Sequence, residues 1–486
     1  MLRTRLAGAL ALACAAFPAQ AQAPCTNGSA GSFACDGIDL LSVLSPAELG
    51  YPGTEGSDVW GWTDPETGRE YALSTTNGGT TFVDITDPVV PVVLGRLDTR
   101  ASGFSNLWRD VKTVGNYAFI VSEVSGYGIQ VFDLTRLRDV ESPPVVFDED
   151  ALYTGFGSAH NIVALPERDL VVGVGANCGL HLVDVSDPTS PTQAGCFNGT
   201  GYVHDAQCVV YDGPDADHQG RDICVASTGG DIAIADVTDP GNATVIARVA
   251  YPNVGYAHQG WLTEDQRYFI ANDEGDETGS SPTRTLVFDF SDLDDPSYVG
   301  KHDGATVSID HNLYTLGDLV FEANYRSGLR VLEMGDLAEA ELTEVAFFDT
   351  FPNSNSASFN GAWSVYPYFS SGTVIVNDIE RGLFMLRVDD FNPVDTAGAP
   401  EASATRLAVF PNPSAGAAQL RLTVAAAGPV RVEVFDVLGR RAALLHDGPV
   451  GADGLRLAVD ALPAGAYVVR ARGADFVATE RLTVTR

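Results

Sequence analysis

Lysine is nearly absent from this chain. Only Lys112 and Lys301 are lysines among 29 basic residues, which stand against 64 Asp and Glu, and the formal net charge is −35. A surface this acidic repels nucleic acid and anionic lipid, so neither is expected as a partner. Acidic, lysine-poor surfaces suit a salty medium, in which screening weakens the repulsion between like charges. The composition therefore favours a halophilic source.

Long apolar runs are missing outside the N-terminus. Arg3 and Arg5 precede an apolar stretch at 6–17, and Ala19-Gln20-Ala21 offers an A-x-A cleavage site. This pattern predicts a secretory signal peptide at 1–21, which is too short to span a bilayer. We therefore expect an exported protein, delivered through the Sec system and the periplasm, with no membrane span in its mature form.

Sequence signatures of common enzymes are also missing. The chain has no G-x-S-x-G elbow, no H-E-x-x-H, no P-loop and no dinucleotide fingerprint. No C-x-x-C or Cys/His cluster has the spacing of a structural zinc site. These absences leave no catalytic residue to predict and make an enzyme the weaker interpretation.

What the chain does contain is a repeat between residues 56 and 394. One mark of the repeat is an apolar-apolar-Asp-apolar-Thr/Ser-Asp-Pro turn, clear at 82–88, 182–188 and 234–240 and weaker around Asp133, Asp289, Glu333 and Arg387. A second mark precedes each turn, at Trp60, Arg109, His160, His204, His258, His311 and Trp363. Both marks recur about every 50 residues, so they are two landmarks of one unit.

A period of this length with several short strands per unit is typical of a β-propeller blade. Seven units predict an all-β, seven-bladed β-propeller over 56–394, since units of this size are too small for separate β-sandwiches. The last unit lacks a fourth strand, and an open ring would expose unpaired strand edges. We therefore predict that Ile38–Leu44, in the N-terminal segment 22–55, is the outer strand of the seventh blade.

Six cysteines remain once Cys14 leaves with the signal peptide, and an even number in an exported protein indicates disulfides. Sequence alone permits many connectivities, but local pairing is expected. The loop at 212–221 joins two strands of the fourth unit, which brings Cys208 and Cys224 together across a strand pair. The predicted disulfides are Cys25–Cys35, Cys178–Cys196 and Cys208–Cys224.

After a linker at 395–405, residues 406–486 alternate apolar and polar positions and are expected to form a small immunoglobulin-like β-sandwich. The segment contains Phe410-Pro411-Asn412-Pro413-Ser414, a strand at 430–435 followed by Asp436-Val437-Leu438-Gly439-Arg440, and Leu462-Pro463-Ala464-Gly465-Ala466-Tyr467 before a last strand at 482–484. In this order the motifs closely resemble the type A C-terminal sorting domain of the type IX secretion system. The resemblance implies handling by that machinery, removal of the domain, and release or anchoring at the cell surface. An accessory module of the same fold is the alternative.

The repeats resemble LVIVD-type repeats. The motifs Ser158-Ala159-His160-Asn161, Tyr202-Val203-His204-Asp205, Tyr256-Ala257-His258-Gln259 and Asp310-His311-Asn312 make residues 36–392 similar to the choice-of-anchor B family. That family shares an extracellular domain joined to different surface-anchoring signals. The resemblance implies an extracellular location and brings no activity with it.

The second mark of the repeat supplies the candidate site. If each unit is a blade, this mark begins its innermost strand, and the seven marks surround one mouth of the central channel. Imidazole is the commonest side-chain metal ligand, and a neighbouring carboxylate or amide would fix its tautomer. The candidate metal ligands are His160, His204, His258 and His311, and the candidate ligand-binding residues are Trp60, Arg109, Asp110, Asn161, Asp205, Asn312 and Trp363.

Two interpretations of the histidines stay open. Each histidine could bond the backbone of the neighbouring blade as a repeated architectural device, which is the simpler interpretation. The alternative is a divalent metal or a polar ligand, and a zinc-like ion needs nitrogens about 2.0–2.1 Å away. The acidic loops at 212–217 and 273–277 could hold calcium, although neither fits the EF-hand pattern and solvated loops are the simpler interpretation.

Three function hypotheses follow. The first is an exported cell-surface or secreted propeller that binds an extracellular ligand or protein. The second is a metal-dependent hydrolase or lyase that uses the histidine-lined mouth. The third is a structural component of the envelope with no small ligand.

Overall fold

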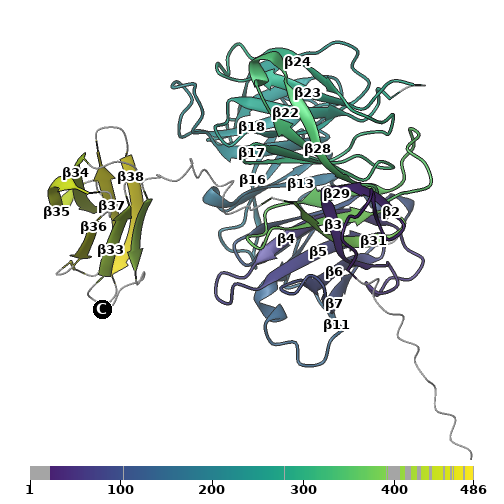
Figure 1. The fold of residues 1–486 in the computed structure, drawn as a ribbon, viewed down its shortest axis with the longest axis horizontal. Helices are drawn as coiled ribbons and strands as arrows, with labels where there is room; N and C mark the ends of the chain where they lie inside the picture. Colours follow the sequence, from purple (N-terminus) through teal and green to yellow (C-terminus); the bar gives the residue numbers. More distant parts are fainter. Residues whose placement is uncertain are drawn as a thin grey trace, which may run out of the picture. The chain divides into compact units, whose positions relative to one another are not determined.

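The computed structural model describes residues 22–101, 103–277, 280–389, 391, 406–410, 418–423, 428–436, 440–451, 455–459, 462–463, 465–473 and 477–484. The chain divides into two compact units, Met1–Thr396 and Ala397–Arg486 (Figure 1). The predicted signal peptide at 1–21 and the predicted linker at 395–405 lie outside the described residues. No helix among the residues that the structure describes is long and apolar enough to cross a membrane.

The larger unit is a β-propeller in which each sequence repeat forms one sheet with its strands in chain order. We number these sheets as blades 1 to 7. Blades 1 to 3 are β4 (Gly56–Thr63), β5 (Glu70–Thr76), β6 (Gly79–Asp84) and β7 (Val92–Asp98); β8 (Arg109–Val114), β9 (Tyr117–Ser122), β10 (Ile129–Asp133) and β12 (Ala151–Tyr153); and β13 (Asn161–Leu165), β14 (Leu170–Val174), β15 (Leu180–Asp184) and β16 (Thr192–Phe197).

Blades 4 to 6 follow the same order. They are β17 (Asp205–Val210), β18 (Asp222–Ser227), β19 (Ile232–Asp236) and β20 (Thr244–Val249); β21 (Ala257–Leu262), β22 (Tyr268–Asp273), β23 (Arg284–Asp289) and β24 (Ser297–Asp303); and β25 (Leu313–Leu316), β26 (Leu319–Ala323), β27 (Leu329–Met334) and β28 (Leu342–Phe348). The described helical residues form short 3-10 turns, η1 (Phe104–Leu107), η2 (Leu134–Leu137), η3 (Pro166–Arg168) and η4 (Leu337–Glu339).

Blade 7 draws its fourth strand from the N-terminal segment. It contains β29 (Ala362–Tyr366), β30 (Thr373–Asp378), β31 (Gly382–Val388) and β3 (Ile38–Leu44). β3 pairs antiparallel with β31 from Ile38↔Val388 to Leu44↔Leu383, with a bulge between Leu40 and Ser42. The innermost strands β29 and β4 are in contact, which closes the ring. The strand pairing predicted from the missing fourth strand is therefore the one that the structure forms.

The Asp-Pro turns join the third and fourth strands of their blades, as the sequence indicates. After β15, the Asp184 carboxylate accepts the backbone N–H of Ser186 at 2.9 Å, and the Asp187 carboxylate accepts that of Thr189 at 3.1 Å. These local bonds to backbone N–H groups are what Asp supplies in a turn. A bulge then bends the strand pair, between Leu182 and Val183 in blade 3.

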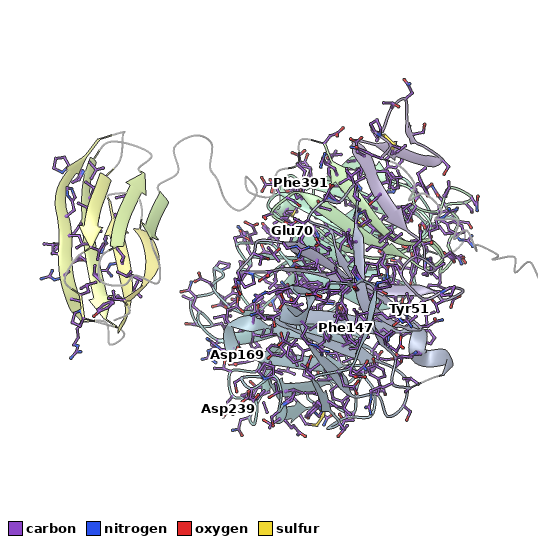
Figure 2. All side chains as sticks on the ribbon, turned by 90° about the horizontal axis from the view of Figure 1, so that it is seen from below. Tyr51, Glu70, Phe147, Asp169, Asp239 and Phe391 are labelled. Carbon is purple, nitrogen blue, oxygen red and sulfur yellow. A yellow bond between two sulfur atoms is a disulfide. The ribbon has the colours of Figure 1, made fainter. Side chains whose placement is uncertain are left out.

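Side chains fill the space between neighbouring blades (Figure 2). Between blades 1 and 2, the rings of Phe82 and Phe132 stack with centroids 4.4 Å apart. Phe147, on the added strand β11 (Val145–Phe147), packs edge-on against Phe132 at 5.0 Å. At the other side of the ring, β1 (Ser29–Ala30) and β2 (Phe33–Asp36) extend blade 6 beyond β28.

The smaller unit packs two antiparallel sheets around one core. One sheet contains β32 (Arg406–Phe410), β33 (Ala418–Thr423) and β36 (Leu455–Val459), and the other contains β34 (Gly428–Asp436), β35 (Arg441–Val450), β37 (Gly465–Arg472) and β38 (Val477–Val484). Leu420 and Leu422 from the first sheet share a buried cluster with Val432, Val434 and Val469 from the second. The immunoglobulin-like strand order stays a prediction.

The three predicted disulfides are present. Cys25 bonds Cys35, Cys178 bonds Cys196, and Cys208 bonds Cys224. The last pair lies directly opposite in the register of β17 and β18. Local strand pairing was therefore sufficient to predict the connectivity.

Replacing Cys208 and Cys224 together by serine is expected to lower the free energy of unfolding by about 3 kcal/mol. The bridge closes a loop with a sequence separation of 16, and cross-linking a loop of this size restricts the unfolded chain by about that amount. Urea denaturation followed by tryptophan fluorescence measures the change. An unchanged free energy in the double variant would contradict the expectation.

Candidate functional site

The four histidines of the repeat lie side by side at one mouth of the channel. We call His160, His204, His258 and His311 the histidine mouth. Consecutive rings have centroids 4.1, 4.4 and 4.3 Å apart, and each side chain is buried. Each ring comes from the start of the innermost strand of a successive blade, from blade 3 to blade 6. The propeller therefore brings these four histidines together, as the sequence predicts.

Three of the four rings are oriented by a hydrogen bond from Nδ1 to an oxygen. His160 Nδ1 donates to Glu123 Oε1 at 2.6 Å, His258 Nδ1 to Asn272 Oδ1 at 3.3 Å, and His311 Nδ1 to the backbone oxygen of Trp363. Because Nδ1 carries the proton in each bond, a neutral ring presents the lone pair of Nε2. Metal-binding histidines are held by outer contacts of this kind.

Glu274 brings a carboxylate to the histidine mouth. Its Oε2 lies 3.8 Å from His258 Nε2, and its Oε1 lies 3.7 Å from His311 Nε2. Tyr325 Oη donates to Oε1 at 2.8 Å and fixes the carboxylate. Two ligand atoms of one zinc-like ion are at most about 4.2 Å apart, so both separations allow a shared ion.

His204 completes the candidate ligand set. One ligand atom each from His204, His258 and Glu274 lie within 4.8 Å of one another. The His204 ring is buried, and its pKa reflects a bond to the backbone of His258 in the next blade.

Burial favours the neutral form of His204, His258 and His311. It lowers the pKa of His204 and His258 well below the usual value, with the neighbouring histidines adding to the effect, and lowers that of His311 to about 3. Burial also raises the pKa of Glu274 to about 7, against the opposing bond from Tyr325. Neutral imidazoles beside a desolvated carboxylate form a site that attracts a cation.

Of the other residues predicted at this mouth, Trp363 lies beside the histidines and Arg109 does not. The centroid of the Trp363 ring lies 4.9 Å from that of His311. The guanidinium of Arg109 instead bonds Asn106 at 2.9 Å and Tyr127 at 2.6 Å, between blades 1 and 2. Its role in the structure is to hold loops together.

Trp60 lies in a different layer of the channel from the histidines. β4 begins at Gly56 and not at Trp60, so the predicted strand start in blade 1 is wrong. The Asp58 carboxylate accepts the N–H of the next residue at 2.7 Å, as Asp205 does in blade 4, which makes these two positions equivalent. Trp60 therefore stands two positions beyond Asp58, where its ring contacts Lys112 at 4.6 Å and Tyr314 at 5.6 Å.

The residues next to the histidines do not orient the imidazoles, contrary to the sequence interpretation. Asn161 Nδ2 donates to the backbone oxygen of His204 at 3.4 Å, and Asn312 Nδ2 donates to Asp58 Oδ2 at 3.1 Å. Successive side chains of a strand point in opposite directions, so these groups face away from the rings. Glu123, Asn272 and the Trp363 carbonyl perform that role instead.

A layer of buried charges lies further along the channel. Lys112 Nζ contacts Asp110 Oδ1 at 2.5 Å. Burial lowers the pKa of Lys112, but the carboxylates of Asp110, Asp58 and Asp205 outweigh this effect and raise it. Lys112 opposes, but does not cancel, the effect of burial that raises the pKa of Asp58 to about 7 and that of Asp205 well above its usual value.

A cavity of about 340 Å³ opens beside this charged layer. The aromatic rings of Trp60, Trp261 and Tyr314 line it together with Lys112 and Asp205. A volume of this size with apolar walls and a few charged groups is typical of small-molecule sites. Trp60 and Asp205, predicted as ligand-binding residues, therefore meet in a cavity away from the histidine mouth.

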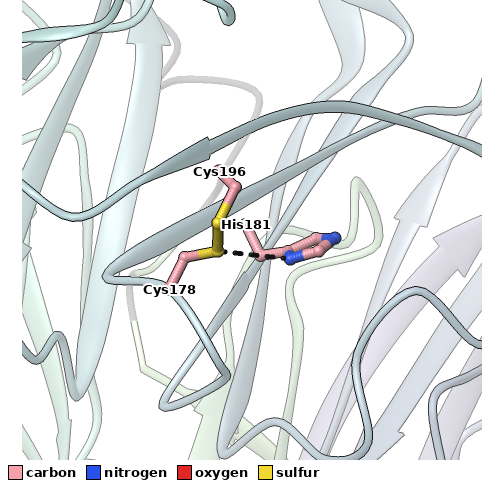
Figure 3. Close-up of side chains that lie close together, drawn as sticks. All are labelled: Cys178, His181 and Cys196. Carbon is pink, nitrogen blue, oxygen red and sulfur yellow. Dashed lines mark hydrogen bonds between the residues drawn. A yellow bond between two sulfur atoms is a disulfide. The ribbon is translucent and has the colours of Figure 1, made fainter.

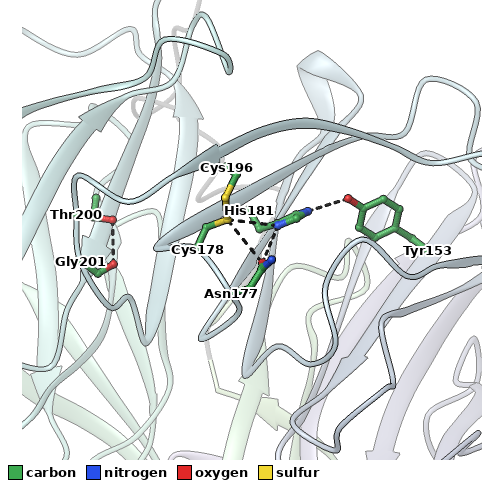
Figure 4. Close-up of a disulfide and its surroundings, with 7 residues drawn as sticks. All are labelled: Tyr153, Asn177, Cys178, His181, Cys196, Thr200 and Gly201. Atoms are coloured by element: carbon green, nitrogen blue, oxygen red, sulfur yellow. Dashed lines mark hydrogen bonds between the residues drawn. A yellow bond between two sulfur atoms is a disulfide. The ribbon is translucent and has the colours of Figure 1, made fainter.

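Two other groups of metal-ligand residues have structural explanations. The Sγ atoms of Cys178 and Cys196 form a disulfide beside His181 and carry no thiolate (Figure 3). Both His181 nitrogens are bonded, Nδ1 to Asn177 Oδ1 at 2.9 Å and Nε2 to Tyr153 Oη at 2.7 Å (Figure 4).

The other group joins two loops. His218 Nε2 bonds Asp294 at 2.9 Å and lies 3.9 Å from Asp215. The Asp294 side chain is 66% exposed, so water can solvate this contact. A surface bond between neighbouring loops accounts for the arrangement.

Two segments of this chain match known protein families, one in the propeller and one in the C-terminal unit. Residues 408–485 match the family model of the secretion system C-terminal sorting domain, and residues 172–199 match that of the LVIVD repeat. The predicted sorting domain and an LVIVD repeat are therefore confirmed, and the similarity to the choice-of-anchor B family stays a prediction. None of the curated proteins matches the sequence.

Several solved structures are similar to this chain at low identity. The extracellular domain of a one-component system, BT4673 of B. thetaiotaomicron, is 8% identical with a TM-score of 0.42, covering 91% of this chain and 58% of its own length. BamB from Moraxella catarrhalis is 11% identical with a TM-score of 0.39, covering 75% of this chain and 95% of its own. The C-terminal WD40 domain of Sif2 is 8% identical with a TM-score of 0.42, covering 69% and 97%. This chain thus spans less than two thirds of the first of these proteins.

Proposed function

We propose that this protein is an extracellular binding protein, exported through the type IX secretion system, whose β-propeller binds a divalent transition metal at the histidine mouth. The sorting domain at 408–485 indicates secretion or a cell-surface location, and a propeller is a scaffold for binding. The predicted signal peptide at 1–21 supplies the first export step.

One observation carries the metal proposal. The Nδ1 atoms of His258 and His311 are bonded to oxygens, and the Nε2 atoms of the two rings lie 3.8 and 3.7 Å from the same Glu274 carboxylate. An architectural histidine needs a hydrogen bond to the neighbouring blade and no second histidine or carboxylate at its other nitrogen. Imidazole and carboxylate together suit Zn²⁺ and related ions.

The ion's ligands would be His204, His258 and the Glu274 carboxylate. His311 Nε2 lies 3.7 Å from the other oxygen of that carboxylate and stands beside this set. His160, held by Glu123, extends the ring of imidazoles beside them. Binding offsets the desolvation cost of Glu274, which gives a physical reason for affinity.

Isothermal titration of the metal-free protein with Zn²⁺ tests the proposal. We expect one site per chain, and His258→Ala should weaken it by more than about 100-fold, because changes outside the ligand set alone cost about 10–100-fold. Glu274→Gln tests the carboxylate in a protein that keeps every histidine. His302→Ala, which removes a histidine from the outer strand β24, is the matched control.

Equal Zn²⁺ affinity in wild type, His258→Ala and Glu274→Gln would contradict the proposal. A wild-type protein that binds no Zn²⁺ would also contradict it. Loss of affinity in His302→Ala as well would indicate a general effect of removing histidine. Circular dichroism of each variant confirms that the fold is retained.

A further inference from the structure

A second group of titratable side chains lies behind the histidine mouth. We call Asp273, Asp276, Glu277 and Asp310 the acidic cluster. The first three belong to the end of β22 and the loop that follows it, and Asp310 precedes β25 of the next blade. Asp273, Glu277 and Asp310 are 0%, 7% and 2% exposed, and the Asp276 side chain is 6% exposed.

Hydrogen bonds from neighbouring groups satisfy the carboxylate of Asp273, whereas the other three carboxyl groups of the acidic cluster receive fewer. Asp273 accepts bonds from Tyr251 Oη and the Gly255 N–H, both at 2.8 Å, and from two further backbone N–H groups. In contrast, Asp310 Oδ1 is buried without a partner, and the carboxyl groups of Asp276 and Glu277 are buried and hydrogen-bonded to each other. A buried carboxylate oxygen without a partner is rare, because it forfeits its hydration.

The charges of the acidic cluster are also unbalanced. Arg284 pairs with Asp276 and lies 4.0 Å from Asp273, so this guanidinium contacts two of the four carboxylates. Burial and the Asp276 charge raise the pKa of Glu277 to about 9. The site therefore lacks positive charge.

We propose that the acidic cluster is a calcium site in which Asp276, Glu277 and Asp310 supply carboxylate oxygens to one ion. Calcium accepts six to eight oxygen ligands in irregular geometry, which suits a loop, whereas Mg²⁺ demands a regular octahedron. A set with oxygen ligands alone also disfavours zinc. Extracellular calcium modules bind with dissociation constants of about 10⁻⁴–10⁻³ M.

Binding is expected to draw the loop and Asp310 together. Ligand atoms of these three residues do not form one of the groups, among the described residues, that lie within 4.8 Å of one another. Oxygens around one calcium are at most about 5 Å apart, so the carboxylates must approach as the ion binds. Two contacts hold the elements close already: the Asp273 N–H donates to Asp310 Oδ2 at 3.4 Å, and Tyr325 holds Glu274 of the same loop.

The acidic cluster and the histidine mouth share backbone segments. Asp310 and His311 are consecutive, as are Asp273 and Glu274, and in each pair the first residue belongs to the cluster and the second to the mouth. Calcium would therefore fix the loop that carries Glu274. The calcium proposal rests on the unpartnered Asp310 oxygen and the buried carboxyl groups beside it, and it stands whether or not the histidine mouth binds metal.

Thermal unfolding of the metal-free protein in 10 mM CaCl₂, compared with 10 mM MgCl₂, tests the calcium site. We expect Ca²⁺ to raise the unfolding midpoint by roughly 3–4 °C more than Mg²⁺, the effect of about 100-fold saturation on a unit of this size. The variant Glu277→Gln/Asp310→Asn should lose this rise. Without calcium it should unfold no earlier than wild type, because it replaces two crowded, desolvated carboxyl groups by neutral amides of the same size.

The matched control is Asp212→Asn/Asp217→Asn, which removes two exposed carboxylates from the other acidic loop. It should keep the full response to Ca²⁺. Equal responses to Ca²⁺ and Mg²⁺ in wild type, or an undiminished Ca²⁺ response in Glu277→Gln/Asp310→Asn, would overturn the proposal. Because Zn²⁺ is absent from this experiment, its failure is distinct from a failure of the histidine site.

Discussion

Deletion of residues 38–44 is expected to unfold the propeller. β3 buries Ile38, Leu40, Leu41 and Leu44 against blade 7 and its neighbours. Full burial of each such side chain is worth about 1.5–3 kcal/mol, so the four together match the entire stability of a typical domain. The deletion also opens the edge of β31, which a closed ring keeps paired.

A milder change measures the same interaction in a protein that still folds. Leu41→Ala should lower the free energy of unfolding by about 2–5 kcal/mol, since it opens a cavity in the core. Val345→Ala, at a position 44% exposed on β28, is the control and should change little. Guanidinium denaturation gives both values, and a deletion variant with the wild-type midpoint would show that β3 does not hold the ring closed.

Removal of residues 406–486 is expected to abolish delivery to the cell surface while the propeller stays folded. The two units have separate cores, so the truncated chain keeps every blade. Export across the outer membrane, in contrast, depends on the segment that matches the sorting-domain model. We expect the truncated protein to accumulate in the periplasm with an unfolding midpoint like that of the full chain.

Cell fractionation and protease treatment of intact cells measure this outcome. A reporter protein joined to residues 406–486 should reach the surface, which shows that the segment is sufficient as well as necessary. Surface display of the truncated chain at the normal level would contradict the sorting role.

Periodic features of the fold could be predicted from the sequence. The Asp-Pro turns repeat because each blade needs the same bend, and the disulfide between Cys208 and Cys224 follows from a local strand pair. The position of β3 followed from an edge that could not remain open. Each of these inferences depends on local chemistry or on closure of the ring.

Features that depend on strand register were predicted less well. β4 has a bulge between Gly56 and Val59, so matching Trp60 to Trp363 placed blade 1 out of register. Arg109 is correctly placed at the start of β8, yet its long side chain turns to Tyr127. A sequence pattern fixes where a residue lies along a strand more firmly than where its side chain ends.

The residues that complete the histidine mouth come from loops with no repeat signal. Glu274 lies in an acidic loop that the sequence indicated only as a solvated or calcium-binding segment, and Glu123 follows β9 without any motif. Both reach the histidines because loops between second and third strands open at the same mouth. That convergence requires the three-dimensional ring and could not be inferred from spacing.

A crystal structure of the protein soaked with Zn²⁺, with anomalous data at the zinc edge, tests the central claim most directly. The account predicts one strong anomalous peak at the histidine mouth, about 2.0–2.2 Å from the ligand nitrogens of His204 and His258 and from a Glu274 oxygen. A map with no peak there, or with zinc bound only at surface carboxylates, would contradict it.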